Sequence, residues 1–243
     1  MPVRAGEREL YTTDNRNTET NFDSNTYIKT WRFIMKGIIF DMDGTLVSSM
    51  PFWNKCYEKV IKGRCSYYPD DLVEILTPLG INKGAEYIHN LGHEKSSQEI
   101  YDEIQDIMTY EYINNIPLKP YAMEYIKSMY DQGIKMCVLS ASTQKMINAC
   151  IESKGVMDYI EFAIASETLN MAKSQPEIFK IIADKMGLRV EEIMVIDDSI
   201  YVLEAAKKAG ATACGIYDDE WKDMVDSVKN TADKYVYSFE ELL

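Results

Sequence analysis

Two aspartates that end an apolar run have the types and spacing to do chemistry. Asp41 and Asp43 follow Ile38-Ile39-Phe40, and Gly44 comes directly after them. The pattern predicts a buried parallel strand that ends in a turn, and open α/β sheets bind ligands at such carboxyl ends. At positions i and i+2 of an extended strand end, the two carboxylates face one side and repel each other unless a cation or a proton lies between them. This arrangement suits a divalent metal with one nucleophilic and one proton-transferring carboxylate, the alternative being two solvated acids.

Polar residues also follow two later apolar runs. Ser140 ends the run at 134–139, and Asp197 and Asp198 end the run at 193–196. Because the carboxyl ends of parallel strands share one edge of a sheet, these side chains are expected to converge with the first two aspartates. The alternatives are an ordinary hydroxyl at a strand end for Ser140 and, for one member of the aspartate pair, a supporting position behind the other.

Lys173 is the candidate cation that would meet an anionic substrate. It lies in a predicted loop directly before a helix that begins near Pro176. A bound metal and one well-placed lysine can reverse the local sign of charge in an otherwise acidic protein. Only the spacing to the proline distinguishes Lys173 from a surface lysine, which is the alternative.

The elements that must position these residues are of two kinds. From about residue 117 onward, β-type runs alternate with helical segments, which predicts a doubly wound, mostly parallel, Rossmann-like sheet of the α/β class. Residues 48–116 instead repeat their apolar side chains at helical spacing, as in Trp53, Tyr57 and Ile61. An all-helical block of this length exceeds a βα crossover, so it is expected to be an inserted α-helical cap domain.

The predicted organisation divides the chain into three parts. Residues 35–47 and 117–243 form the core domain, and residues 48–116 form the cap domain. Residues 1–34 are polar, lack apolar periodicity and lack the apolar segment of a secretory signal, so they are expected to be a flexible tail. Met35 directly precedes the first predicted strand, which leads to the hypothesis that it is the functional start.

Composition narrows the choice of partners. The net charge of −13 disfavours nucleic acid and anionic membrane surfaces, but it leaves room for a small phosphorylated metabolite held by a metal and a lysine. The five cysteines form no C-x-x-C pair and have mostly apolar neighbours, which is typical of reduced thiols in a cytoplasmic protein. No apolar run in the sequence is long enough to span a bilayer. The oligomeric state stays open, with a monomer as one option.

Four ordered motifs resemble those of the haloacid dehalogenase superfamily, in the capped branch that contains phosphoglycolate phosphatases and β-phosphoglucomutase. The resemblance runs from about residue 35 to residue 243. Its motifs, each at a predicted strand end or loop, are Asp41-Met42-Asp43-Gly44-Thr45, Leu139-Ser140-Ala141-Ser142, Lys173-Ser174-Gln175-Pro176 and Ile196-Asp197-Asp198-Ser199. One such motif alone would be a weak signal, but four in the right order are a strong one.

The resemblance implies a catalytic role for four residues. Asp41 would be the nucleophile that forms an aspartyl phosphate. Asp43 would be the general acid that protonates the leaving oxygen and then the base that activates water. Lys173 would neutralise the charge of the phosphate and the nucleophile, and Ser140 would help to hold the phosphoryl group.

The resemblance also implies ligands for substrate and metal. Ala141 and Ser142 would bind substrate beside Ser140, where backbone N–H groups are available. Mg²⁺ would be bound directly by Asp198, together with the Asp41 carboxylate and the backbone carbonyl of Asp43, while Asp197 supports that set. An all-oxygen, carboxylate-rich site of this kind suits Mg²⁺.

A predicted loop at 77–84 is the candidate for substrate selection. Its glycines and proline suit a cap loop that faces the active site, where relatives select substrates. Asn82 and Lys83 are its candidate substrate contacts, and a solvated loop is the alternative. His89 and His93 are expected to be structural or exposed, because a glycine intervenes between them and no acidic third ligand is evident.

The leading prediction for function is Mg²⁺-dependent hydrolysis of a small organic phosphate monoester. A phosphomutase of the β-phosphoglucomutase type would need the same core residues and would differ only in the acceptor. Dehalogenation is disfavoured, because relatives with that activity lack an acid at the position of Asp43. A non-catalytic binding protein on the same fold is a further alternative, although it would keep four clustered acids at an electrostatic cost. A receiver-type signalling domain would be shorter and would lack the helical insert.

Overall fold

The computed structural model describes residues 35–65, 67–69, 71–76 and 79–243. The predicted flexible tail at 1–34 lies outside the described residues, as do positions 77 and 78 of the predicted loop. Residues 35–243 group as one compact unit.

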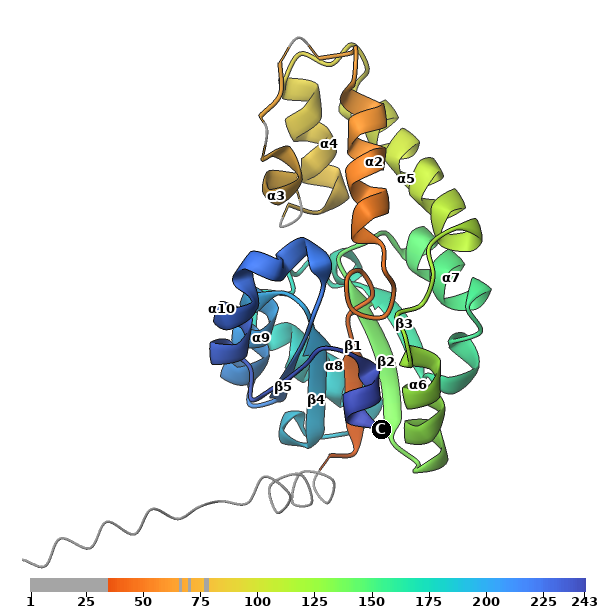
Figure 1. Cartoon of the computed structure of the whole chain (residues 1–243), viewed down its shortest axis with the longest axis vertical. Helices are drawn as coiled ribbons and strands as arrows, with labels where there is room; N and C mark the ends of the chain where they lie inside the picture. Colours follow the sequence, from red (N-terminus) through yellow and green to blue (C-terminus); the bar gives the residue numbers. More distant parts are fainter. Residues whose placement is uncertain (1–34, 66, 70, 77–78) are drawn as a thin grey trace, which may run out of the picture. The chain divides into compact units, whose positions relative to one another are not determined.

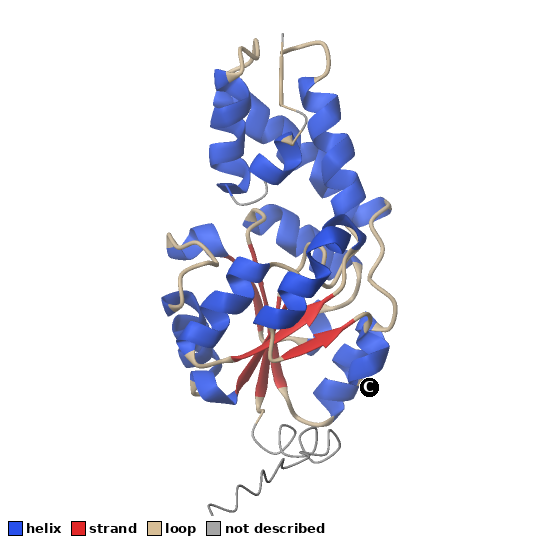
Figure 2. Cartoon of the chain, turned by 60° about the vertical axis from the view of Figure 1, so that its left-hand side comes forward, coloured by secondary structure: helices blue, strands red, loops and turns tan. Residues whose placement is uncertain are grey.

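A parallel sheet forms the centre of the described chain (Figure 2). Its order is β3-β2-β1-β4-β5-β6, and every neighbouring pair is parallel. The strands are β1 (Gly37–Phe40), β2 (Lys135–Ser140), β3 (Phe162–Ala165), β4 (Ile193–Asp197), β5 (Thr212–Ile216) and β6 (Lys234–Val236). The strand order reverses between β1 and β4, which is the switch point where doubly wound sheets bind ligands. The predicted α/β class is therefore confirmed.

Helices cover both faces of this sheet (Figure 1). They are α6 (Ala122–Asp131), α7 (Gln144–Ser153), α8 (Glu177–Met186), α9 (Ile200–Ala209) and α10 (Val225–Thr231). None of the helices in the described part of the chain has both the length and the apolar character that crossing a membrane requires.

The side chains of β1 show how the two faces are filled. Ile39 belongs to a buried cluster that includes Phe179 of α8 and Leu203 of α9. Phe40 packs on the other face, edge-on against Tyr125 of α6, with ring centroids 6.2 Å apart. A strand buried on both faces reads as a continuous apolar run, which explains the pattern before Asp41.

A helical insert, defined as α2 to α5, lies between β1 and α6 in the chain. Its helices are α2 (Met50–Ile61), α3 (Leu72–Leu76), α4 (Gly80–Asn90) and α5 (Ser97–Asn114). A capping box begins α5: the Ser96 side chain accepts a hydrogen bond from the Glu99 backbone N–H, and the Glu99 carboxylate accepts one from the Ser96 backbone N–H. The boundary between a core domain and a separate cap domain stays a prediction.

The prediction of a loop at 77–84 is wrong from Gly80 onward, because α4 begins there. Ile81, Ala85 and Ile88 form one buried face of this helix. Gly84 also lies on the buried side, where a Cβ atom would come within 3.6 Å of the Leu76 side chain. The low helix propensity of the two glycines explains why the sequence predicts a loop here. In the folded chain, burial of the apolar face outweighs that propensity, and a helix forms.

Candidate active site at the carboxyl edge of the sheet

Asp41 occupies the first position after β1, at the switch point of the sheet. Its backbone N–H donates to the Ile196 carbonyl of β4 at 2.9 Å, which continues the β1–β4 ladder by one residue. The chain then turns, with the N–H groups of Leu46 and Val47 both donating to the Met42 carbonyl. The strand thus ends before Asp43 instead of continuing through it, and the two aspartates do not share one strand face.

Gly44 is required by this turn for two reasons. Its φ is +77°, a left-handed conformation that side chains other than glycine rarely adopt. A Cβ atom at this position would also lie 2.3 Å from Oδ2 of Asp198. The glycine therefore lets the turn after β1 come into contact with the carboxylate after β4.

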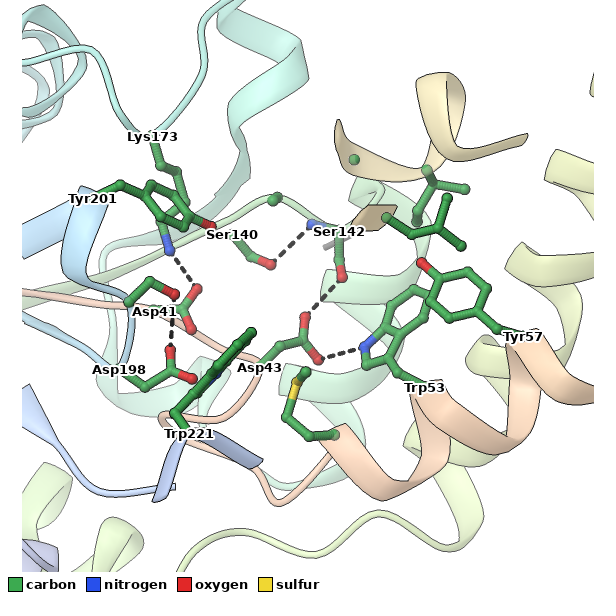
Figure 3. Close-up of a pocket in the computed structure, with 16 residues that line it drawn as sticks. Asp41, Asp43, Trp53, Tyr57, Ser140, Ser142, Lys173, Asp198, Tyr201 and Trp221 are labelled. Carbon is green, nitrogen blue, oxygen red and sulfur yellow. Dashed lines mark hydrogen bonds and ion pairs between the residues drawn. The ribbon is translucent and has the colours of Figure 1, made fainter. Parts of the chain in front are cut away.

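Lys173 joins two of the predicted acids. Its Nζ atom donates to Oδ1 of Asp41 at 2.5 Å (Figure 3). It also donates to Oδ2 of Asp197 at 2.6 Å. The lysine is only 7% exposed, and burial by itself would lower its pKa. The attraction of the two carboxylates outweighs burial and raises the pKa of Lys173 above its usual value. The sequence-predicted cation therefore stays charged among the acids.

We call Asp41, Asp197, Asp198 and Lys173 the acid cluster. Burial raises the pKa of Asp41 to about 7, against the opposing attraction of Lys173. Burial, followed by the charges of Asp197 and Asp41, also raises the pKa of Asp198 well above its usual value. Three buried carboxylates with one buried lysine leave negative charge uncompensated, so the cluster favours a further cation.

The acid cluster offers ligands for such a cation. One carboxylate oxygen from each of Asp41, Asp197 and Asp198 can be chosen so that all three lie within 4.8 Å of one another. Oδ2 of Asp197 already accepts from Lys173, and its Oδ1 accepts from the Ser199 N–H at 2.9 Å. The oxygens of Asp41 and Asp198 are less occupied, and hard carboxylate oxygens suit Mg²⁺.

Asp43 points away from the acid cluster and toward the helical insert (Figure 3). Its Oδ2 accepts a hydrogen bond from the Ser142 hydroxyl at 2.8 Å, and its Oδ1 accepts one from Nε1 of Trp53 at 3.2 Å. The Tyr112 hydroxyl donates to the same Oδ1. Burial, and then the nearby Asp43, raise the pKa of Tyr112 well above its usual value, so this tyrosine remains a proton donor.

The predicted phosphate-binding residues lie between these two groups. Ser140 and Ala141 line the pocket at the end of β2. The Ser140 hydroxyl accepts a hydrogen bond from the Ser142 N–H at 3.0 Å, and Ser142 in turn holds Asp43. The structure thus brings Ser140, Ala141 and Ser142 to the edge where the aspartates converge.

The two candidates on α4 are not brought to the site. Asn82 and Lys83 are exposed and do not line the pocket, although Gly80 and Ile81 of the same helix do. The Asn82 amide instead donates to the Glu167 carboxylate at 3.2 Å. The sequence predicts a cap loop for both residues, whereas the helix found there presents only one of its sides to the pocket.

The histidines have structural contacts. His93 is buried, its Nδ1 accepts from the Lys95 N–H at 3.0 Å, and its Nε2 lies 3.0 Å from the Val60 carbonyl. His89 is exposed and its Nδ1 lies 2.8 Å from the Lys95 carbonyl. Neither histidine takes part in the described cluster of metal-ligating residues.

Sequence reasoning missed the aromatic lining of the pocket. Trp53 and Tyr57 of α2, Tyr201 of α9 and Trp221 all line it, in a space of about 660 Å³ that includes its open mouth. The helical spacing of Trp53 and Tyr57 predicts a helix, but it does not indicate that the two rings line a pocket. Trp221 lies in a short 3₁₀ segment after β5, and no motif marked it.

Comparisons with known proteins agree with this geometry. A model of the haloacid dehalogenase-like hydrolases matches residues 35–210. The chain is 24% identical over 181 residues to the phosphorylated carbohydrates phosphatase of Thermotoga maritima, covering 72% of this chain and 82% of that protein. It is 26% identical over 222 residues to the glyceraldehyde 3-phosphate phosphatase of Methanocaldococcus jannaschii, covering 86% and 96%.

A solved structure extends the comparison to the fold. The β-phosphoglucomutase of Clostridium difficile is similar to this chain with a TM-score of 0.70 at 18% identity, covering 86% of this chain and 93% of that one. At this identity the likeness concerns the fold alone. The family match, in contrast, spans most of the chain and includes every residue of the acid cluster. The chain belongs to the haloacid dehalogenase-like hydrolases.

Proposed function

We propose that this hydrolase is a Mg²⁺-dependent phosphatase that hydrolyses a small organic phosphate monoester through an aspartyl phosphate on Asp41. The observation that carries the proposal is the buried contact of Lys173 with Asp41 and Asp197, beside the further carboxylate of Asp198. A nucleophilic carboxylate, a cation and a second cation site at one sheet edge are the groups that phosphoryl transfer needs. Relatives named as phosphatases of phosphorylated carbohydrates and of glyceraldehyde 3-phosphate support the reaction class.

Asp41 is the group assigned to attack phosphorus. Its Oδ1 is held by Lys173, so the other oxygen, Oδ2, is the one available as nucleophile. The lysine offsets negative charge on both the carboxylate and the transferring phosphoryl group. Attack forms the Asp41–phosphate bond and breaks the bond between phosphorus and the leaving oxygen.

Asp43 is the group assigned to proton transfer. When protonated, it gives its proton to the leaving oxygen, and it then takes a proton from the water that attacks the aspartyl phosphate. Ser142, Trp53 and Tyr112 donate to this carboxylate and fix its position. The Ser140 hydroxyl lies at the pocket edge where it can contact the phosphoryl group.

Asp198 and Asp41 are the residues that would hold Mg²⁺, with Asp197 supporting them through Lys173 and Ser199. When bound, the ion would neutralise phosphate charge and help to orient the phosphoryl group. The backbone carbonyl of Asp43 stays the proposed third protein ligand.

The helical insert is proposed to act as a cap domain over this site. Trp53, Tyr57 and Ile81 of the insert line the pocket together with residues of the sheet edge. Such a cap would keep bulk water from the reacting groups. The cytoplasm is the proposed location, supported by five free cysteines that include four buried ones.

The experiment is phosphate release by the full chain from a panel of phosphate monoesters. It is run with Mg²⁺, with EDTA, and with Asp41→Asn, and Asp131→Asn serves as the matched control because Asp131 is exposed at the end of α6. We expect release that requires both Mg²⁺ and Asp41 and is unchanged in the control. No release by the wild type would contradict the phosphatase, and isomerisation of a sugar phosphate without net release would establish the mutase instead.

A further inference from the structure

We propose that the substrate of this site carries an uncharged leaving group with an apolar face, and neither a carboxylate nor a second phosphate. The inference rests on the proposed function and names its substrate class. A neutral sugar phosphate or an aryl phosphate belongs to this class. Phosphoglycolate and bisphosphates lie outside it.

The first argument concerns charge. Among the described residues that line the pocket, Lys173 is the sole cationic side chain. Its ammonium group already contacts Asp41 and Asp197, so its charge is committed to the end of the pocket that receives the phosphoryl group. The four internal positions that the structure does not describe carry no basic side chain either, being Ser66, Asp70, Thr77 and Pro78.

A second lysine, Lys119, whose charge acts on Asp198, is also committed to other partners. Lys119 is half-buried, and its Nζ pairs with the Asp218 carboxylate at 2.9 Å and donates to the Tyr217 carbonyl at 2.5 Å. It does not line the pocket. A second anionic group on the substrate would therefore be desolvated without a cationic partner, in a pocket that already contains Asp43 and Asp198.

The second argument concerns the position of the leaving group. Asp43 stands between the acid cluster on one side and Trp53 and Tyr57 on the other (Figure 3). A proton donor to the leaving oxygen must lie on the side where that oxygen departs. The leaving group is thus directed from Asp41 past Asp43, toward α2.

The third argument concerns what lines that end. The rings of Trp53 and Tyr57 lie with centroids 5.5 Å apart and planes tilted by 31°, and both side chains are 7% exposed. Met50, Leu76 and Ile81 complete this apolar end. Clustered aromatic and aliphatic side chains bind apolar faces, such as an aryl ring or the C–H face of a sugar.

The test compares two substrates of equal size that differ in one charge. 4-Carbamoylphenyl phosphate has a neutral amide where 4-carboxyphenyl phosphate has a carboxylate. With the full chain and Mg²⁺, we expect kcat/KM to be at least about tenfold higher for the neutral compound, since unpaired buried charge is strongly disfavoured. A hexose 1-phosphate and the corresponding 1,6-bisphosphate form a second pair with the same expected order. Equal values, or a preference for the charged member of both pairs, would overturn the inference and leave the phosphatase intact.

A binding measurement separates the inference from the proposed reaction. Asp41→Asn with Mg²⁺ is titrated with both aryl compounds by calorimetry. Tighter binding of the neutral compound supports the inference even if the wild type releases no phosphate. The absence of phosphate release would contradict only the proposed phosphatase activity. Binding of neither compound, together with no turnover of either, would overturn both.

A designed cation sharpens the test. Ile81→Lys places an ammonium group at the apolar end, and Asn90→Lys adds the same charge at an exposed position of the same helix. We expect Ile81→Lys to raise the ratio of kcat/KM for the charged over the neutral compound by about tenfold, and Asn90→Lys to leave it within about twofold. Met50→Lys, at the start of α2, provides a second variant if Ile81→Lys does not fold. An unchanged ratio in a folded variant would count against the inference.

Discussion

The acid cluster and the surroundings of Asp43 hold their carboxylates in opposite ways. In the acid cluster, one lysine pairs with two of the three buried carboxylates, and burial raises the pKa values of Asp41 and Asp198. Asp43 accepts hydrogen bonds from three uncharged donors, two of which belong to the helical insert. Compensation of charge organises the sheet side of the pocket, whereas hydrogen-bond geometry organises the insert side. Substitutions on the sheet side should therefore disturb the charge balance of buried carboxylates, whereas substitutions on the insert side should disturb the position of Asp43.

Lys173→Met should have the largest effect, because it removes the one cation of the acid cluster. Asp41 and Asp197 would lose their buried partner, which costs about 3–5 kcal/mol of the free energy of unfolding. We expect kcat to fall by about 10²- to 10³-fold as well. Chemical denaturation and steady-state kinetics measure the two effects. Lys180→Met, at an exposed position of α8, is the control and should change neither; a near-normal Lys173→Met would show that the cluster does not depend on its lysine.

Gly44→Ala should have the second-largest effect, because it both strains the turn and displaces the Asp198 side chain. Gly63 offers a matched control, since its φ is also +77° but a Cβ atom added there would meet nothing within 4 Å. Gly63→Ala should lose about 1–2 kcal/mol from the left-handed conformation alone. Gly44→Ala should lose more and should also weaken Mg²⁺ binding, as measured by calorimetry. Equal losses with unchanged Mg²⁺ affinity would show that the contact with Asp198 is unimportant.

The dependence of Mg²⁺ stabilisation on pH tests the excess charge of the acid cluster. Burial raises the pKa of Asp41 from 3.8 to about 7. A carboxyl with a raised pKa in the folded state contributes stability that is fully present below its unfolded pKa and is lost as the pH rises through its folded pKa. The metal-free protein should therefore lose stability between pH 3.8 and about 7.

Mg²⁺ binds ionised carboxylates, so it should offset this loss mainly above neutral pH. At a Mg²⁺ concentration of about 100 times Kd, the expected gain is about 2.7 kcal/mol. Thermal unfolding near pH 5 and near pH 8, with and without Mg²⁺, measures it, and Asp198→Asn should abolish the gain. A larger gain in stability near pH 5 than near pH 8 would contradict the proposal that Mg²⁺ binds the ionised carboxylates of the acid cluster.

Tyr112→Phe should have the smallest effect of the four and should act on the insert side alone. The tyrosine donates to Asp43, so its loss should lower kcat/KM by about tenfold for alkyl phosphates, whose poor leaving groups need protonation. Aryl phosphates with good leaving groups should be affected less. Tyr110→Phe is the matched control, because Tyr110 lies on the same helix and is 60% exposed. An equal loss for both substrate classes would assign Tyr112 a merely structural role.

The four motifs explain why the acid cluster could be foreseen. Parallel strands with continuous apolar runs end at one edge of a sheet, so the residues at the carboxyl ends of β1, β2 and β4 must meet there. Lys173 could be added to this group because it lies in a loop directly before a helix. The roles of these residues stay proposals, but their convergence follows from strand order and chain direction.

The insert side could not be foreseen in the same way. Trp53 and Tyr112 lie on different helices, and their contacts with Asp43 depend on how α2 and α5 pack against the sheet edge. Helical periodicity says that a face is apolar but not which partner covers it. The same limit led to Asn82 and Lys83 as substrate contacts on a loop that is in fact the start of α4.

Taken by itself, the sequence determined the α/β class, the order of the motifs and the residues that gather at the carboxyl edge. These three features depend on apolar runs of a few residues and on the common direction of parallel strands, and both can be recognised from short stretches of sequence. Only the tertiary structure decided that Asp43 turns from the acid cluster to Ser142 and the insert, and that, among the described residues, one lysine serves the whole pocket. Such features arise from side chains far apart in the chain, because packing between helices selects which of their faces meet.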